Sequence, residues 1–144
     1  MEVAVRKDSL SSGAALAAVS AAVAHGCARG VAVVAAVVDP GGHVLACLRA
    51  DGAFAASVDI ARDKAWTAAI FGCSTDQLCE GVSGREALRE GIALRPNVVL
   101  FGGGLPARAG GLVLGAIGVS GGSEDDDRAC AAAGLTAIGL GLGQ

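Results

Sequence analysis

Aromatic side chains are nearly absent from this chain. They make up 3% of its 144 residues, with three Phe, one Trp and no Tyr. Proteins that bind nucleic acids usually stack bases on aromatic rings and carry an excess of positive charge. Because the formal net charge here is −3, neither requirement is met, and we expect no nucleic-acid partner.

Paired cysteines and metal-binding clusters are also lacking. The five cysteines are odd in number and none forms a C-x-x-C pair; they are Cys27, Cys47, Cys73, Cys79 and Cys130. A zinc site or a disulfide framework would require closer or paired spacing. We therefore interpret them as small buried residues of a protein in a reducing compartment, and we predict no metal site.

No apolar run is long enough to span a bilayer before Gly, Pro or a charge interrupts it, although 53% of the residues are hydrophobic. The first eight residues lack the order of a signal peptide, because their charges follow the apolar residues. We therefore predict no membrane partner and a cytoplasmic location. The length fits one domain over residues 1–144 with a core of its own.

What the sequence has instead is small residues. Ala and Val supply most of the apolar content, and there are 23 Gly. Such a composition indicates close backbone packing, and so much apolar surface would aggregate in a monomer. We therefore expect a homo-oligomer.

Apolar periodicity predicts alternating hairpins and helices. The expected order is a helix ending near Gly26 or Gly30, strands at 31–38 and 43–49, a helix at 53–71, short helices within 72–91, strands at 98–100 and 112–119, and a helix from Ser123 to Gly134. The apolar segment 135–142 is either a last strand or an oligomer contact. Hairpins joined through helices favour an α+β domain with an antiparallel sheet.

The stretch from Phe101 to Pro106 contains three consecutive glycines between two apolar runs. We interpret it as the connection of a hairpin formed by 98–100 and 112–119. Gly102, Gly103 and Gly104 have no side chains, so a ligand could approach their backbone closely. A plain hairpin loop is the alternative. The charged, irregular segment 72–91 has the length of a flap over a pocket, or it is a solvated surface.

Three cations could converge on this glycine stretch. Arg49 ends the second predicted strand, Lys64 lies on the small-residue helix, and Arg108 follows the glycines. A lone lysine on a helix is more often solvated. His25 and His43 fit surface positions better than ligand positions. The acidic run 124–127 after Ser123 is better explained by helix capping than by a cation site.

The motifs as a set resemble the GlcG/HbpS-like family, which includes the C-terminal domain of PduO-type cobalamin adenosyltransferases. The segments that carry the resemblance are Val37–Gly42, Arg49–Ala53, Ser57–Ala61, Lys64–Ala68, Phe101–Pro106 and Gly115–Gly122. The resemblance implies a profilin-like α+β fold with a five-stranded antiparallel sheet and flanking helices, in an oligomer. It also implies haem binding, haem breakdown or redox sensing, although many members have no established activity.

Two functions of different classes follow. The first is a binding protein for haem or a related tetrapyrrole, in which Gly102–Gly104 face the macrocycle and Arg49, Lys64 or Arg108 pair with its propionates. The second is a cofactor-free isomerase, lyase or cyclase acting on a small anionic metabolite. There the glycine amides hold an oxyanion, and Lys64 and Arg49 are the catalytic residues. A third hypothesis is a structural domain that mediates assembly and binds no ligand.

Overall fold

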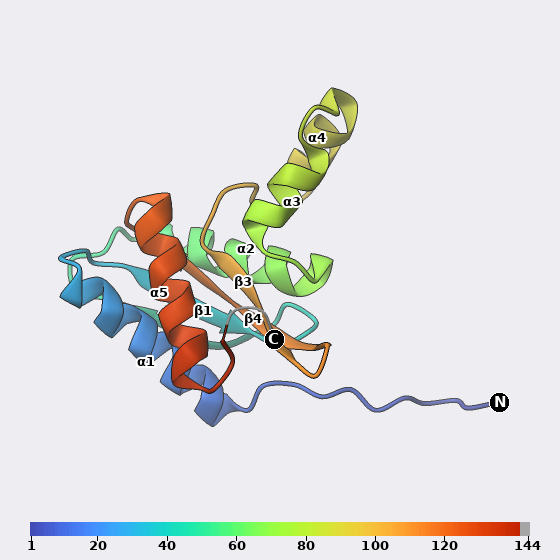
Figure 1. Ribbon diagram of the computed structural model, residues 1–144, viewed down its shortest axis with the longest axis horizontal. Helices are drawn as coiled ribbons and strands as arrows, with labels where there is room; N and C mark the ends of the chain where they lie inside the picture. The colour runs from blue at the N-terminus through green and yellow to red at the C-terminus, as the bar shows by residue number, and fades with distance from the viewer. Residues whose placement is uncertain (142–144) are drawn as a thin grey trace.

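The computed structural model describes residues 1–141, and its elements form an α+β fold around one antiparallel sheet (Figure 1). The elements in chain order are α1 Ser12–Ala28, β1 Val34–Val38, β2 Val44–Arg49, α2 Ala56–Phe71, α3 Thr75–Val82, α4 Glu86–Ala93, β3 Gly104–Ala109, β4 Leu112–Ser120 and α5 Glu124–Ala137. In the described part of the chain, no helix has the length and apolarity needed to cross a membrane.

The sheet has four strands in the order β2-β1-β4-β3, and every neighbouring pair is antiparallel. The resemblance implies five strands, and this detail is wrong for residues 1–141, whose sheet has four. Strand β1 is central and all five of its residues are 0% exposed. Its unbroken Ala and Val sequence is typical of a strand covered on both faces.

Helices cover both faces of the sheet. Helices α1 and α5 pack together on one face, and α2 packs on the other, mainly over β4 and β1 (Figure 1). Small residues allow the close approach. A Cβ added to Gly134 of α5 would lie 2.8 Å from the Ala18 carbonyl oxygen of α1. On the opposite face, Gly118 of β4 packs directly against the Ala61 carbonyl of α2.

The predicted hairpin around the glycine stretch is wrong. Residues 98–100 form no strand, and the hairpin joins β3 to β4 through Gly110 and Gly111. The segment before the glycines is held by α2 instead, because the N–H of Val99 donates to Thr67 Oγ1 at 3.0 Å. Pro106 lies inside β3, which is possible because β3 is an edge strand and one of its sides needs no N–H donor.

The predicted end of α5 at Gly134 is also wrong, since the helix continues to Ala137. Close packing of Gly134 on α1 keeps it helical, and Leu135 is buried at 3% exposure. Residues 138–141 form no strand, so the described part of 135–142 does not supply a fifth one. Residue 142 lies outside the described residues.

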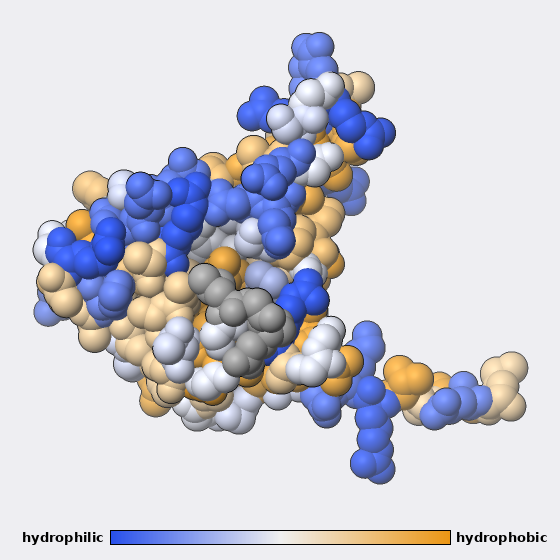
Figure 2. Space-filling model, in the orientation of Figure 1, coloured by the Kyte–Doolittle hydropathy of each residue, from blue (hydrophilic) through white to orange (hydrophobic). Residues whose placement is uncertain are grey.

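Helices α3 and α4 form an arm that projects from the body (Figure 1). Helix α3 is capped by a reciprocal pair of hydrogen bonds between Ser74 and Gln77. It packs on α2 and β3, whereas α4 packs on α3. The outer surface of the arm and the beginning of α5 carry much of the hydrophilic surface on the side seen in Figure 2. Closure of segment 72–91 as a flap stays a prediction.

Candidate functional site

The most unusual side chain of the molecule is Lys64, a lysine that is 1% exposed. It lies on α2, whose alanine-rich face packs so closely on the sheet that the lysine stem runs between helix and strand. Its Nζ donates to the Val119 carbonyl oxygen at 2.8 Å and to Asp127 Oδ2 at 3.0 Å. Phe101 covers the ammonium, with the ring centroid 5.1 Å from Nζ, which is within cation–π range.

Asp127 completes a buried ion pair with Lys64, because its own side chain is only 5% exposed. Its second oxygen, Oδ1, accepts the N–H of Gly122 at 3.0 Å. Burial lowers the pKa of Lys64 and raises the pKa of Asp127, while their mutual attraction opposes both shifts. Each charge therefore depends on the other, and removing either would leave an uncompensated charge in the interior.

The glycine stretch bends around this pair. Gly103 has φ +122°, and a Cβ there would lie 2.8 Å from Lys64 Nζ and 2.7 Å from the Val119 oxygen. A Cβ on Gly104 would lie 2.6 Å from Thr75 Cγ2. The missing side chains thus make room for groups of the protein itself, and those groups fill the bend.

Two of the main-chain donors predicted to bind an oxyanion are already hydrogen-bonded. The N–H of Gly102 donates to Glu124 Oε1 at 2.7 Å, and the N–H of Gly104 donates to Thr75 Oγ1 at 3.1 Å. Glu124 reaches Gly102 because it is the first residue of α5. A ligand could reach these donors only by displacing Glu124 and Thr75.

Arg128 ties the beginning of α5 to the base of the arm. Its guanidinium forms two hydrogen bonds of 2.8 Å to the carboxylate of Asp76 on α3 and one of 2.9 Å to Asp125. It also lies 3.6 Å from Glu124. Two cations, Lys64 and Arg128, thus face four carboxylates, so the cluster has two more negative charges than positive ones. This balance does not favour an additional anion.

The three cations of the sequence prediction do not converge. Lys64 lies against Gly103 and Gly104, but Arg49 is exposed at the end of β2, on the opposite edge of the sheet. Three strand spacings of about 4.8 Å separate the two edges by roughly 14 Å. Arg108 lies four residues beyond Gly104 in β3, and its guanidinium donates to the Gly72 carbonyl oxygen.

Sequence reasoning missed the partners of Lys64 and of the glycines, namely Asp127, Glu124 and Thr75. The acidic run was interpreted as a helix cap, which is confirmed by the reciprocal hydrogen bonds of Ser123 and Asp126. Glu124 and Asp127 of this run have a second role besides adding negative charge at the helix N-terminus, because Glu124 binds the N–H of Gly102 and Asp127 pairs with Lys64. The available signal was that no carboxylate lies three or four residues from Lys64 along its helix, so a buried Lys64 would need a counter-ion from elsewhere in the chain. This signal does not identify which distant carboxylate that is.

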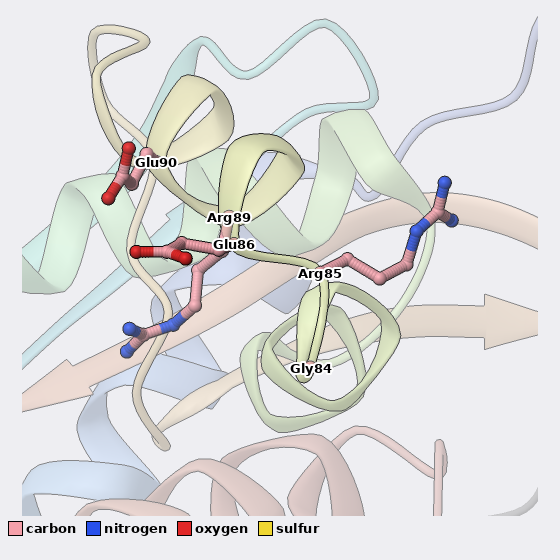
Figure 3. Close-up of a pocket in the computed structure, with 5 residues that line it drawn as sticks. All are labelled: Gly84, Arg85, Glu86, Arg89 and Glu90. Atoms are coloured by element: carbon pink, nitrogen blue, oxygen red, sulfur yellow. The ribbon is translucent and has the colours of Figure 1, made fainter.

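Two cavities of ligand size differ sharply in their lining. One, of about 340 Å³, lies where the chain passes from α3 into α4 (Figure 3). It is lined by Gly84, Arg85, Glu86, Arg89 and Glu90. Arg85 points away from the other charged side chains there. The other, of about 300 Å³, is lined by Arg6, Lys7, Asp8, Pro40, Leu112 and Val113. Haem iron takes an axial His, Cys, Met or Tyr. Neither lining contains one, so neither cavity fits haem.

The two histidines lie elsewhere. His25 is half-buried in the last turn of α1, and the side chain of His43 is 83% exposed with its Nδ1 3.3 Å from Asp39 Oδ1. Within residues 1–141, no group of three or more His, Cys, Asp or Glu side chains could hold a metal ion.

Comparison with known proteins places this fold in a family. The family model described as "Haem degrading protein HbpS-like" matches residues 10–136. An uncharacterised 15.0 kDa protein of the dhaT-dhaS intergenic region of Citrobacter freundii is 43% identical over 68% of this chain and 70% of its own length. The corrinoid adenosyltransferase PduO of Salmonella typhimurium is 35% identical over 79% of this chain, which spans about a third of that longer protein, 34%.

Solved structures agree over nearly the whole chain. The protein ORFY of Klebsiella pneumoniae superposes with a TM-score of 0.90 at 32% identity, covering 96% of this chain and 97% of its own. The crystal structure of a PduOC:haem complex superposes with a TM-score of 0.81 at 32% identity, covering 94% of this chain and 99% of the other.

Proposed function

Because the chain belongs to the HbpS-like family, we propose that it is a small-ligand-binding protein whose ligand is haem or a related tetrapyrrole. One observation carries the proposal. One of the structures that superpose on this chain, over 94% of it and 99% of its own length, is a complex with haem. A likeness that covers both chains nearly end to end supports a shared ligand better than a partial match would.

His25 is the axial ligand that we propose. It is half-buried on α1, and no hydrogen bond within residues 1–141 occupies its ring. The ring of His43, in contrast, is close to Asp39. A propionate requires a cation, and Lys64 and Arg108 are held by Asp127 and Gly72. Arg49, exposed at the end of β2, is therefore the residue that we assign to a propionate.

The glycine stretch does not form an open part of the proposed haem site, because groups of the protein fill its bend and hold its donors. A macrocycle that reaches Gly102–Gly104 would first have to displace Phe101, which is 48% exposed and lies over Lys64. His25 and Arg49 line neither of the two cavities described above, so the proposed haem surface lies outside both.

Titration of the purified chain with haemin tests the proposal. The expected result is a sharp Soret shift that saturates at a fixed stoichiometry, together with a higher melting temperature, since a ligand bound only to the folded state stabilises it. A spectrum identical to that of free haemin throughout the titration would contradict the proposal. Other tetrapyrroles lacking iron, titrated in the same way, distinguish recognition of the macrocycle from recognition of the metal.

The enzyme alternative depends on Lys64 as a base, with Arg49 orienting an anionic substrate. The lowered pKa of Lys64 suits a base. Nevertheless its ammonium is paired with Asp127 and Arg49 lies at the other edge of the sheet, so the geometry of residues 1–141 favours ligand binding over this alternative. The alternative predicts that Lys64→Met loses turnover of a substrate found by screening, whether or not haem is present.

A further inference from the structure

The cavity of about 300 Å³, which the proposed function does not use, lies between the segment that precedes α1 and the turns at one end of the sheet. Its volume is at the lower end of the range for small-molecule sites. Three parts of the chain line it. They are residues 6–8 of the segment before α1, Pro40 of the β1–β2 turn, and Leu112 and Val113 at the beginning of β4.

The lining of this cavity separates apolar groups from charged ones. Pro40 and the two residues of β4 form an apolar wall, whereas all the charges come from residues 6–8. Leu112 is 58% exposed, so this wall is open to a ligand. An apolar surface with a small number of charged groups is the common composition of a small-molecule site.

Two of the charged residues, Arg6 and Lys7, have no counter-ion within the chain. No ion pair among residues 1–141 includes either of them. The other lysine of the chain, Lys64, is paired with Asp127. Neighbouring cations without a counter-ion, on a chain whose net charge is −3, create a local positive potential that attracts an anion.

The carboxylate of Asp39, next to Pro40, is held by its own turn. Its Oδ1 accepts the N–H of Gly41 at 2.9 Å and the N–H of His43 at 3.0 Å. Asp39 does not line the cavity, where Asp8 is the only acid. The lining therefore carries two positive charges and one negative charge.

The segment that carries these charges is fixed to the body at Leu10. This residue is 8% exposed, and its N–H donates to the Leu114 carbonyl oxygen at 2.9 Å. The residues before it are exposed, and Figure 1 shows the segment leaving the body there. Leu10 thus holds Arg6 and Lys7 beside the cavity, while their long side chains keep the freedom to close over a ligand.

We propose that this cavity is a second ligand site, which binds a small monocarboxylate with an apolar body. The carboxylate is held by Arg6 and Lys7, and the apolar body lies on Leu112 and Val113. Both cations donate charge-assisted hydrogen bonds to carboxylates, and an Arg can donate two at once. One carboxylate neutralises the net positive charge of the lining. A phosphate monoester, with a charge of about −2 at neutral pH, would exceed it and be repelled by Asp8.

This site is separate from the proposed haem surface. His25 lies in the last turn of α1, whereas the cavity is near the other end of that helix, which begins at Ser12. A rise of 1.5 Å per residue from Ser12 to His25 separates the two ends by about 20 Å. The inference therefore goes beyond the proposed function, and either can fail without the other.

Trp66 provides a reporter for the site, because it is the only Trp in a chain without Tyr. It packs on the turn that contains Pro40, since a Cβ added to Gly42 would lie 2.8 Å from Trp66 Nε1. Titration of the haem-free chain with 4-phenylbutyrate and with octanoate, followed by Trp66 fluorescence and by calorimetry, tests the proposal. We expect saturable binding at one site per chain. The uncharged amide of each acid should bind about tenfold more weakly or worse, because it loses the charge-assisted hydrogen bonds.

A double variant with a matched control locates the binding. Arg6→Gln/Lys7→Gln changes exposed residues outside every helix and strand, so circular dichroism should show an intact fold while carboxylate binding weakens about tenfold or more. Arg85→Gln/Arg89→Gln removes two cations from the other cavity and should leave the titration unchanged. The proposal is overturned if neither carboxylate gives a saturable response, if the amides bind equally well, or if Arg6→Gln/Lys7→Gln binds like the unaltered chain. Tighter binding of 4-phenylbutyl phosphate than of 4-phenylbutyrate would also overturn it.

Discussion

The ammonium of Lys64 lies 3.0 Å from the carboxylate of Asp127, and the two side chains are 1% and 5% exposed. This pair connects α2 to the beginning of α5, on opposite faces of the sheet, through the gap left by Gly103. Two charges are costly to bury, but breaking such a pair is costlier than keeping it. The pair therefore fixes how α5 and the glycine stretch are positioned.

Removing one partner should destabilise the fold strongly. Asp127→Ala leaves Lys64 buried without its counter-ion, and we expect the free energy of unfolding to fall by about 3–5 kcal/mol. Denaturant unfolding measures it. In the double variant Lys64→Met/Asp127→Leu much of the loss should be recovered. Asp59→Ala, which breaks an exposed pair with Arg62, should cost only about 0–1 kcal/mol. Equal losses for Asp127→Ala and Asp59→Ala would refute the structural role of the buried pair.

The gap at Gly103 should not tolerate a methyl group. Gly103→Ala places a Cβ 2.8 Å from Lys64 Nζ at φ +122°, so it combines a steric clash with backbone strain. Gly52→Ala is the matched control, because φ is +85° there and nothing lies within 4 Å of the added Cβ. The control should lose about 1–3 kcal/mol from strain alone, and Gly103→Ala should lose clearly more. Thermal unfolding of both variants measures the difference, and the reverse order is incompatible with the described packing.

Acid should loosen the junction between α3 and α5. The hydrogen bonds from Arg128 hold the pKa of Asp76 below its ordinary value of 3.8. A lowered folded-state pKa contributes stability above the unfolded value, and this contribution disappears as the pH falls through the folded-state pKa. Stability should therefore decline below pH 3.8 partly through this pair. Asp76→Asn and Arg128→Gln should both flatten that part of the pH–stability curve. If stability falls as steeply below pH 3.8 in both variants as in the unaltered chain, the pair does not contribute to the pH dependence of stability.

Much of the fold could be predicted from local signals. The first helix, the hairpin around Asp39-Pro40-Gly41-Gly42 and the long helix before Phe71 each combine a periodic apolar pattern with a recognisable turn or cap. Strand β3 could not, because Gly104, Pro106 and Arg108 do not look like a strand. The apolar residues 98–100 do look like one, but Thr67 of α2 holds them outside the sheet. Tertiary contacts overrode local propensity at that point.

The candidate site was predictable only in part. Lys64 does lie against Gly103 and Gly104, yet the bend is filled by groups of the protein that no sequence spacing identifies. Asp127 is 63 residues from Lys64, and among consecutive acids only packing decides which one faces inward. Arg49 was expected nearby because it is a cation at a strand end. Strand order, which the sequence does not reveal, places it at the far edge of the sheet.

The absorption spectrum of ferric haem mixed with His25→Ala, compared with His43→Ala and the unaltered chain, is the decisive measurement for the proposed haem binding. An axial imidazole gives a shifted Soret band that depends on the histidine supplying it. The band is expected to revert toward that of free haemin in His25→Ala and to stay unchanged in His43→Ala, whose ring is exposed beside Asp39. A spectrum unaffected by His25→Ala, or the absence of any haem complex with the unaltered chain, would contradict it.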